Sequence, residues 1–133
     1  MEVKFYEIDE IEEHLLKYAV IVASYNGKWV FCKNKYREWE LPGGHREEGE
    51  SIVKTAEREL IEETGAEKFK LIPVCAYSIN SYGWLFYAEI EKLGSLPESE
   101  IEKIGFFEDI PDKLSFPLFH PKHFRKVKDF LEG

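Results

Sequence analysis

One stretch of the sequence, from Gly44 to Ala66, constrains the fold and the chemistry of this chain more than any other. A loop bounded by glycines leads into a segment whose apolar residues recur at steps of three and four, which predicts a helix over Ser51–Thr64. Glu50 supplies a negative charge near the start of this helix, and Gly65 stands where a left-handed residue ends one. The apolar positions are Ile52, Val53, Ala56 and Leu60.

Three carboxylates gather on this helix, because Glu59, Glu62 and Glu63 stand at i, i+3 and i+4. At about 6 Å and an effective dielectric of about 20, each pair costs on the order of 3 kcal/mol. Helix propensity does not offset that cost, whereas a hard divalent cation such as Mg²⁺ or Mn²⁺ would. The alternative is a solvated acidic helix end with Arg58 and Lys54 as ion-pair partners. The adjacent glycine loop favours the metal site.

These residues resemble the Nudix box of the Nudix hydrolases, which include the MutT-type enzymes. Gly44, Glu50 and the run Arg58-Glu59-Leu60-x-Glu62-Glu63-x-Gly65 fill every fixed glycine, arginine and glutamate of that pattern. Ala66 departs from it, since the family usually has a bulkier aliphatic residue there, and this difference concerns packing. The segment Trp39–Gly44 also resembles the one that precedes the box in the family.

The resemblance implies an α/β/α sandwich with a mixed β-sheet, in one domain over residues 1–133, with a loop-helix-loop catalytic box. In that box Glu59, Glu62 and Glu63 would bind Mg²⁺ or Mn²⁺, and one of them, Glu59 or Glu62, or else an acid from a later loop, would act as general base. The remaining fixed residues would be structural: Gly44, Glu50, Arg58 and Gly65.

Two more metal ligands are implied by the resemblance. The Gly43 carbonyl would add an uncharged oxygen. A further acid would come from the loop before the pair Phe106-Phe107, where Glu100 has a suitable spacing and Glu98 and Glu102 are alternatives. The other interpretation of Glu100 is an ordinary surface acid.

Substrate-binding residues lie outside the box. Lys33, Lys35 and Arg37 either face substrate phosphates or are solvated loop charges. The aromatic residues either stack on a nucleobase or pack in the core. We predict Lys33, Arg37, Trp39 and Tyr82 as substrate-binding residues, and the other aromatic candidates are Trp84, Phe86 and Phe116.

The rest of the chain predicts strands around the box helix and a second helix near the C-terminus. Asn26-Gly27 indicates a hairpin, Pro73 a bulge or an edge, and Asn80–Gly83 a turn. A final helix over Phe119–Leu131 would bury Phe124, Val127, Phe130 and Leu131. The strands are expected over residues 3–8, 18–25, 28–33, 69–79, 84–93 and 99–107, which together with the helices indicate a mixed sheet between helices.

The composition of the chain narrows the range of its possible binding partners. The net charge of −8 argues against DNA binding through phosphate contacts, although it leaves room for a nucleotide held through a metal. No apolar signal region or membrane-length run is present, and Cys32 and Cys75 are expected to be buried free thiols. These features predict a cytoplasmic protein. Its oligomeric state stays open.

The sequence therefore predicts a metal-dependent pyrophosphohydrolase that converts a nucleoside triphosphate, including an oxidised one such as 8-oxo-dGTP, to a monophosphate and pyrophosphate. The alternatives are dinucleoside polyphosphates and RNA 5′ ends, the latter suggested by the basic residues of the last helix, Lys122, Arg125, Lys126 and Lys128. A non-catalytic nucleotide-binding regulatory domain is disfavoured because every box glutamate is present. His120 and His123 are interpreted as structural rather than as transition-metal ligands.

Overall fold

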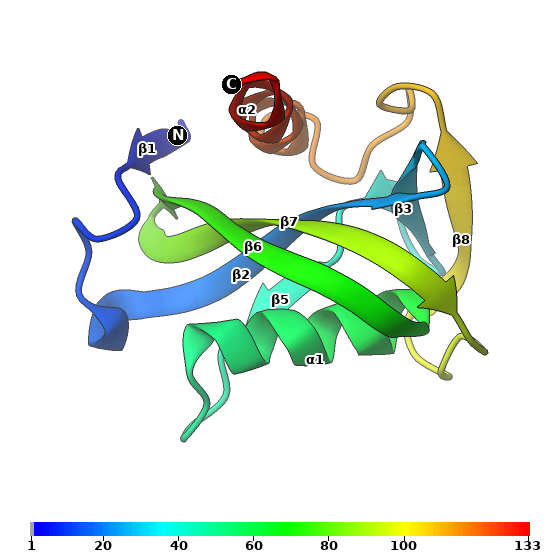
Figure 1. Cartoon of the computed structure of the whole chain (residues 1–133), viewed down its shortest axis with the longest axis horizontal. Coiled ribbons are helices and arrows are strands. Elements are labelled where there is room, and N and C mark those ends of the chain that lie inside the picture. The colour runs from blue at the N-terminus through cyan, green and yellow to red at the C-terminus, as the bar shows by residue number, and fades with distance from the viewer. Residues whose placement is uncertain (1) are drawn as a thin grey trace.

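A mixed β-sheet lies between two helices in the computed structural model, which describes residues 2–133 (Figure 1). The helical elements are the 3₁₀ turn η1 (Glu13–Leu15), α1 (Ile52–Thr64) and α2 (His120–Glu132). The strands are β1 (Lys4–Tyr6), β2 (Leu16–Tyr25), β3 (Lys28–Asn34), β4 (Trp39–Glu40), β5 (Gly43–His45), β6 (Ala66–Ile79), β7 (Ser81–Leu93) and β8 (Ile101–Phe107).

The sheet has the order β1-β6-β7-β2-β3-β4, with β5 added beside β2 and β8 beside β3. Strands β2 and β7 run parallel, and the other pairs are antiparallel. Helix α1 covers one face and α2 the other, so the predicted α/β/α sandwich is confirmed (Figure 1). None of the helices in residues 2–133 is both long and apolar enough to span a membrane. The extent of the domain and the cytoplasmic location stay predictions.

Strand β2 is buried on both faces, which explains its uninterrupted apolar sequence. Ala19 and Ile21 pack on the α1 side with Leu60. Val20 and Val22 alternate with them and pack on the α2 side. Because β2 touches both layers, it fixes the two helices relative to one another.

Two local predictions are wrong. The segment Gly43–His45 is not a loop but pairs antiparallel with β2, so closely that a Cβ at Gly43 would collide with the carbonyl oxygen of Ala19. The predicted four-residue turn at 80–83 shrinks to Asn80, whose left-handed φ of 67° reverses the chain before β7 begins at Ser81. The Asn26-Gly27 hairpin is confirmed, as is the bulge in β6 after Pro73.

Helix α2 buries a different set of residues from the predicted one. Phe124 and Val127 are in the core, but Phe130 and Leu131 in the last turn are exposed. Two histidines take the inner positions of the first turn instead. Leu41 donates its amide to Nδ1 of His120 at 3.2 Å, and the His123 ring lies edge-on to Tyr77 with the ring centroids 4.7 Å apart.

The two buried histidines make stability depend on pH. Burial lowers the pKa of His120 to about 4 and that of His123 to about 3, whereas an unfolded histidine titrates near about 6.5. Between these values the unfolded chain binds more protons, so the free energy of unfolding falls as the pH drops below about 6.5.

We expect His123→Phe to lose about 2 kcal/mol less stability than the wild type between pH 7 and pH 5, measured by urea unfolding at both pH values. His14→Gln is the matched control, since this histidine is exposed and contacts Glu12. If His123→Phe and the wild type lose equal stability, the His123 ring is not held neutral by the fold.

Candidate active site

The ends of α1 are fixed by local caps, so the positions of its carboxylates are fixed as well. Ser51 accepts a hydrogen bond from the Lys54 amide at 3.2 Å and caps the N-terminus. Gly65 adopts a φ of 77° and donates its amide to the Ile61 carbonyl at 2.9 Å. The predicted limits of this helix are thus confirmed, with Ser51 as its cap.

Glu50 and Arg58 tie the box loop to the helix. The Arg58 guanidinium donates from Nε to Oε2 of Glu50 at 2.6 Å and from Nη2 to Oε1 at 3.0 Å. Nη2 also donates to the His45 carbonyl at 3.1 Å. This two-bond ion pair lowers the pKa of the Glu50 carboxyl to about 2 and raises that of Arg58. A two-bond ion pair between loop and helix is the geometry that the predicted structural role of Glu50 and Arg58 requires.

Glu59 and Glu63 lie between α1 and β5. Only 13% of the Glu59 side chain is exposed, Arg58 Nη1 donates to its Oε2 at 3.1 Å, and a Cβ at Gly44 would overlap its carboxylate. Glu63 accepts a hydrogen bond from the Gly43 amide at 3.0 Å. The absence of a side chain at Gly44 therefore makes room for the Glu59 carboxylate, and the Gly43 amide holds that of Glu63.

Burial raises the pKa of both carboxyls. The pKa of Glu63 rises to about 8, chiefly because it is removed from water, although the hydrogen bond from Gly43 opposes the shift. The negative charges of Glu59 and Glu40 raise it further. For Glu59 burial again dominates, and the charge of Arg58 opposes it. Burial thus opposes ionisation of both carboxyls, and the charge of Arg58 counters this at Glu59.

Glu62 is the accessible member of the three. Half of its side chain is exposed, and its Oε1 lies 3.5 Å from Arg58 Nη1. Within residues 2–133, no three acids, histidines or cysteines converge into a ready set of metal ligands. Like charges repel without a cation, and Glu59 and Glu63 are each held by a hydrogen-bond donor instead. An all-oxygen donor set with excess negative charge fits a hard divalent cation.

Within residues 2–133, no hydrogen bond or ion pair joins Glu100 to the box glutamates, and its role as a ligand stays a prediction. Glu100 is exposed just before β8, and its backbone carbonyl accepts from the Lys35 amide at 2.8 Å. Across residues 2–133, its carboxylate has no hydrogen bond or ion pair. Glu98 and Glu102 are exposed as well. The structure brings Gly43 to Glu63 and Gly44 to Glu59.

Three of the predicted substrate-binding residues, Lys33, Arg37 and Trp39, lie together around β3 and β4, and Tyr82 lies apart from them. Lys33 donates from Nζ to the carbonyl of Arg37 at 2.6 Å, and Trp39 packs edge-on against Phe107 with centroids 4.9 Å apart. Tyr82 packs against the core on the α1 side. Arg37 pairs with the buried Glu40 at 3.3 Å.

A cavity that sequence reasoning missed lies on the α2 side of β5. It has a volume of about 210 Å³, and Tyr18, Tyr77, Phe116 and His123 are among its walls. The Tyr18 hydroxyl lies 2.6 Å from Nε2 of His45, which follows Gly44 in β5. Because neighbouring residues of a strand point to opposite faces, this cavity and the box carboxylates lie on either side of β5.

One predicted substrate residue, Arg37, lies next to a residue that lines this cavity. The Arg37 guanidinium lies 5.4 Å from the centroid of Phe116. The sequence signal for this cavity was the alternation along β2, which places Tyr18 and Val20 on the same face.

Comparisons with known proteins agree with this geometry. The NUDIX domain model matches residues 15–110. The Bacillus subtilis protein YtkD, which carries the provisional name of an 8-oxo-dGTP diphosphatase, is 30% identical over 105 residues. That match covers 74% of this chain and 66% of YtkD, slightly under two thirds of its length.

Solved structures show the same fold. The Bacillus subtilis pyrophosphohydrolase BsRppH has a TM-score of 0.78 and 25% identity, covering 96% of this chain and 90% of that one. A Caenorhabditis elegans Ap4A hydrolase has a TM-score of 0.65 and 19% identity, covering 88% and 99%, which is a likeness of fold. Since the domain model covers most of the chain, including the whole stretch from Gly44 to Ala66, the protein belongs to the Nudix hydrolase family.

Proposed function

We propose that this protein is a metal-dependent pyrophosphohydrolase that converts a nucleoside triphosphate to a monophosphate and pyrophosphate. The observation that carries the proposal is the pair of largely buried carboxylates, Glu59 and Glu63, held against the glycines of β5. Oxidised nucleotides such as 8-oxo-dGTP are included among the substrates, a choice that the similarity to YtkD supports.

The residues that would hold Mg²⁺ or Mn²⁺ are Glu59, Glu62, Glu63 and the carbonyl of Gly43. A bound divalent ion neutralises charge on phosphate oxygens and lowers the pKa of a coordinated water. Arg58 orients Glu59 and balances part of the site's charge in the free protein. Glu62 is the more accessible of the two candidate general bases, since half of its side chain faces solvent.

The cavity on the α2 side would hold the nucleoside. Tyr18 and Phe116 offer aromatic surface to a base, and the Tyr18–His45 hydrogen bond lies on the cavity side of β5. A nucleotide seated there would pass its phosphates around the edge of β5 toward Glu59 and Glu63. The cavity and the carboxylates would then act on one molecule from opposite faces of a single strand.

RNA 5′ ends are a second candidate substrate. Lys122 and Arg125 are exposed on α2, the helix whose His120 and His123 line the cavity. Such charges would contact phosphates downstream of the first nucleotide.

We expect Glu62→Gln to lower the rate of pyrophosphate release by about 10²–10⁴-fold while the protein stays folded, because the variant removes a negative oxygen ligand and candidate base. Ordinary and oxidised triphosphates, dinucleoside polyphosphates, ADP-ribose and triphosphorylated RNA should be tested with Mg²⁺, and the products identified. Glu57→Gln, on the same helix but paired with Lys54, is the control. Wild-type turnover in Glu62→Gln would remove this residue from the mechanism.

Glu63→Gln should separate metal binding from stability. With EDTA at pH 8, we expect the variant to be more stable than the wild type by on the order of 2 kcal/mol, because the glutamine needs no proton or cation to be buried. The sign follows from the raised pKa of about 8, which makes ionised Glu63 increasingly unfavourable to the fold as the pH rises from about 4.5 to 8. Mg²⁺ should raise the melting temperature of the wild type but not that of the variant. Equal responses to Mg²⁺ in thermal unfolding would contradict the assignment.

Filling the cavity should weaken nucleotide binding without removing the chemistry. Ser81 lines it, and we expect Ser81→Phe to raise KM for a triphosphate at least about tenfold, or about 1.4 kcal/mol, with little change in kcat. Steady-state kinetics on the folded variant test this. Ser95→Phe, at an exposed loop residue, should behave as the wild type. An unchanged KM in Ser81→Phe would place the nucleoside elsewhere.

A further inference from the structure

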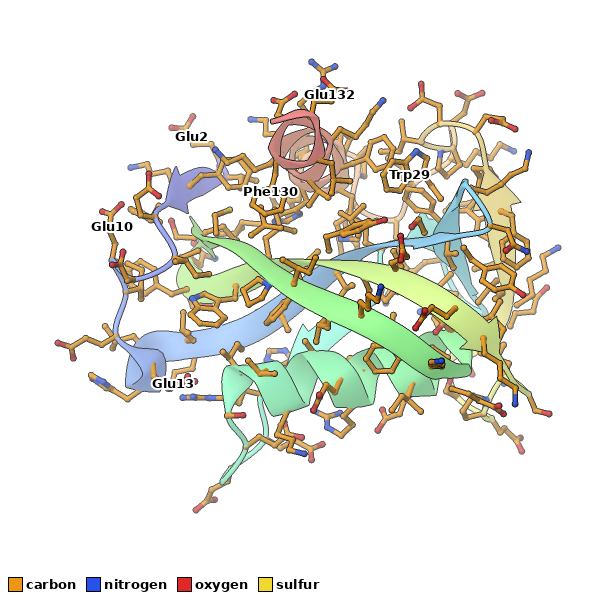
Figure 2. All side chains as sticks on the ribbon, in the orientation of Figure 1. Glu2, Glu10, Glu13, Trp29, Phe130 and Glu132 are labelled. Carbon is orange, nitrogen blue, oxygen red and sulfur yellow. The ribbon has the colours of Figure 1, made fainter. Side chains whose placement is uncertain are left out.

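A residue outside the box contacts the first turn of the carboxylate-bearing helix. Glu13 lies in η1, just before the residues that match the family model. Its Oε2 accepts hydrogen bonds from Arg46 Nη1 at 2.9 Å and from the Ile52 amide at 3.1 Å. Ile52 begins α1, so this amide has no partner within the helix. Figure 2 shows Glu13 beside the start of α1.

Arg46 extends this connection into the box loop. Its side chain is only 16% exposed, and its Nη2 donates to the His14 carbonyl at 3.2 Å. Its backbone amide donates to the Lys17 carbonyl at 2.8 Å. The segment before β2 therefore holds the Arg46 side chain, and Lys17 in β2 holds its backbone. Glu50 and Arg58 hold the loop from within the box, and Glu13 holds it from a segment outside the box.

We propose that Glu13 is a positioning residue that fixes α1 against β5 and thereby sets the reach of the Glu59 and Glu63 carboxylates. Glu59 lies seven residues, about two turns, after Ile52 on one continuous helix. A displacement of the first turn is carried along the helix to the carboxylates, where a metal site tolerates little misplacement. This inference rests on the proposed function of the box glutamates and extends it to a residue beyond the family match.

An ordinary surface ion pair would have no such effect. Glu13 is 55% exposed, and exposed pairs contribute little to stability. What distinguishes Glu13 is its second bond, to a helix amide, and the burial of its arginine partner. The positioning role therefore predicts a change in the metal site, whereas a surface pair predicts none.

The test measures Mn²⁺ binding to metal-free protein by electron paramagnetic resonance, without nucleotide. We expect Glu13→Ala to weaken Mn²⁺ binding about tenfold, as loss of an outer-shell partner does elsewhere, and Glu13→Gln to weaken it less because one acceptor oxygen remains. Glu12→Gln is the matched control, since the neighbouring Glu12 is 77% exposed and contacts only His14 among the described ion pairs.

Three further measurements complete the test. Amide hydrogen exchange over residues 46–52 should quicken in Glu13→Ala without metal, kcat should fall about tenfold, and KM should stay within about twofold. Glu13→Ala combined with Arg46→Ala should weaken Mn²⁺ binding no more than the stronger single variant, because both remove the same brace.

The outcomes separate this inference from the proposed function. Wild-type Mn²⁺ affinity in folded Glu13→Ala overturns the positioning role, even if its melting temperature falls. Absence of Mn²⁺ binding in the wild type overturns it too. Normal Mn²⁺ binding by the wild type without hydrolysis of any nucleotide would refute the proposed function and leave the positioning role to be decided by the variants.

Discussion

The hydrogen bond between the Gly43 amide and the Glu63 carboxylate joins β5 to α1, the two elements on which the site depends. It requires β5 and α1 to approach closely, and that approach removes Glu63 and Glu59 from water. Burial of two like charges is unfavourable, and Arg58 offsets only part of it. A cation bound at the site proposed above would offset this cost.

Rigidity around this contact comes from three sources. Core packing of Ile52 and Leu60 holds α1 to the sheet, and the Glu50–Arg58 pair holds the loop to α1. The Glu13–Arg46 pair adds a tie to the segment before β2. Core packing of Ile52 and the bond from its amide to Glu13 both act at the start of α1, and Arg58 acts nearer the middle of the helix.

The limits of α1 could be predicted because they are encoded locally, by the cap at Ser51 and the glycine at 65. The cavity could not, since Tyr18, Tyr77 and Phe116 come from separate segments that meet only in the folded chain. Strand β5 was missed because a short glycine pair carries no strand pattern, and its pairing depends on β2. Lys33 and Tyr82 have partners that the sequence does not reveal, a backbone carbonyl for one and core packing for the other, and their substrate roles stay predictions.

The placement of β5 between cavity and carboxylates has an evolutionary consequence. Substitutions in Phe116, Ser81 or Tyr77 reshape one side of the strand without touching the acids on the other. With the nucleoside in this cavity, as proposed above, a lineage with this architecture would change its ligand while the box acids stay the same. Such proteins would differ in the ligand that they recognise and share one reaction, because the two sets of residues lie on opposite sides of β5.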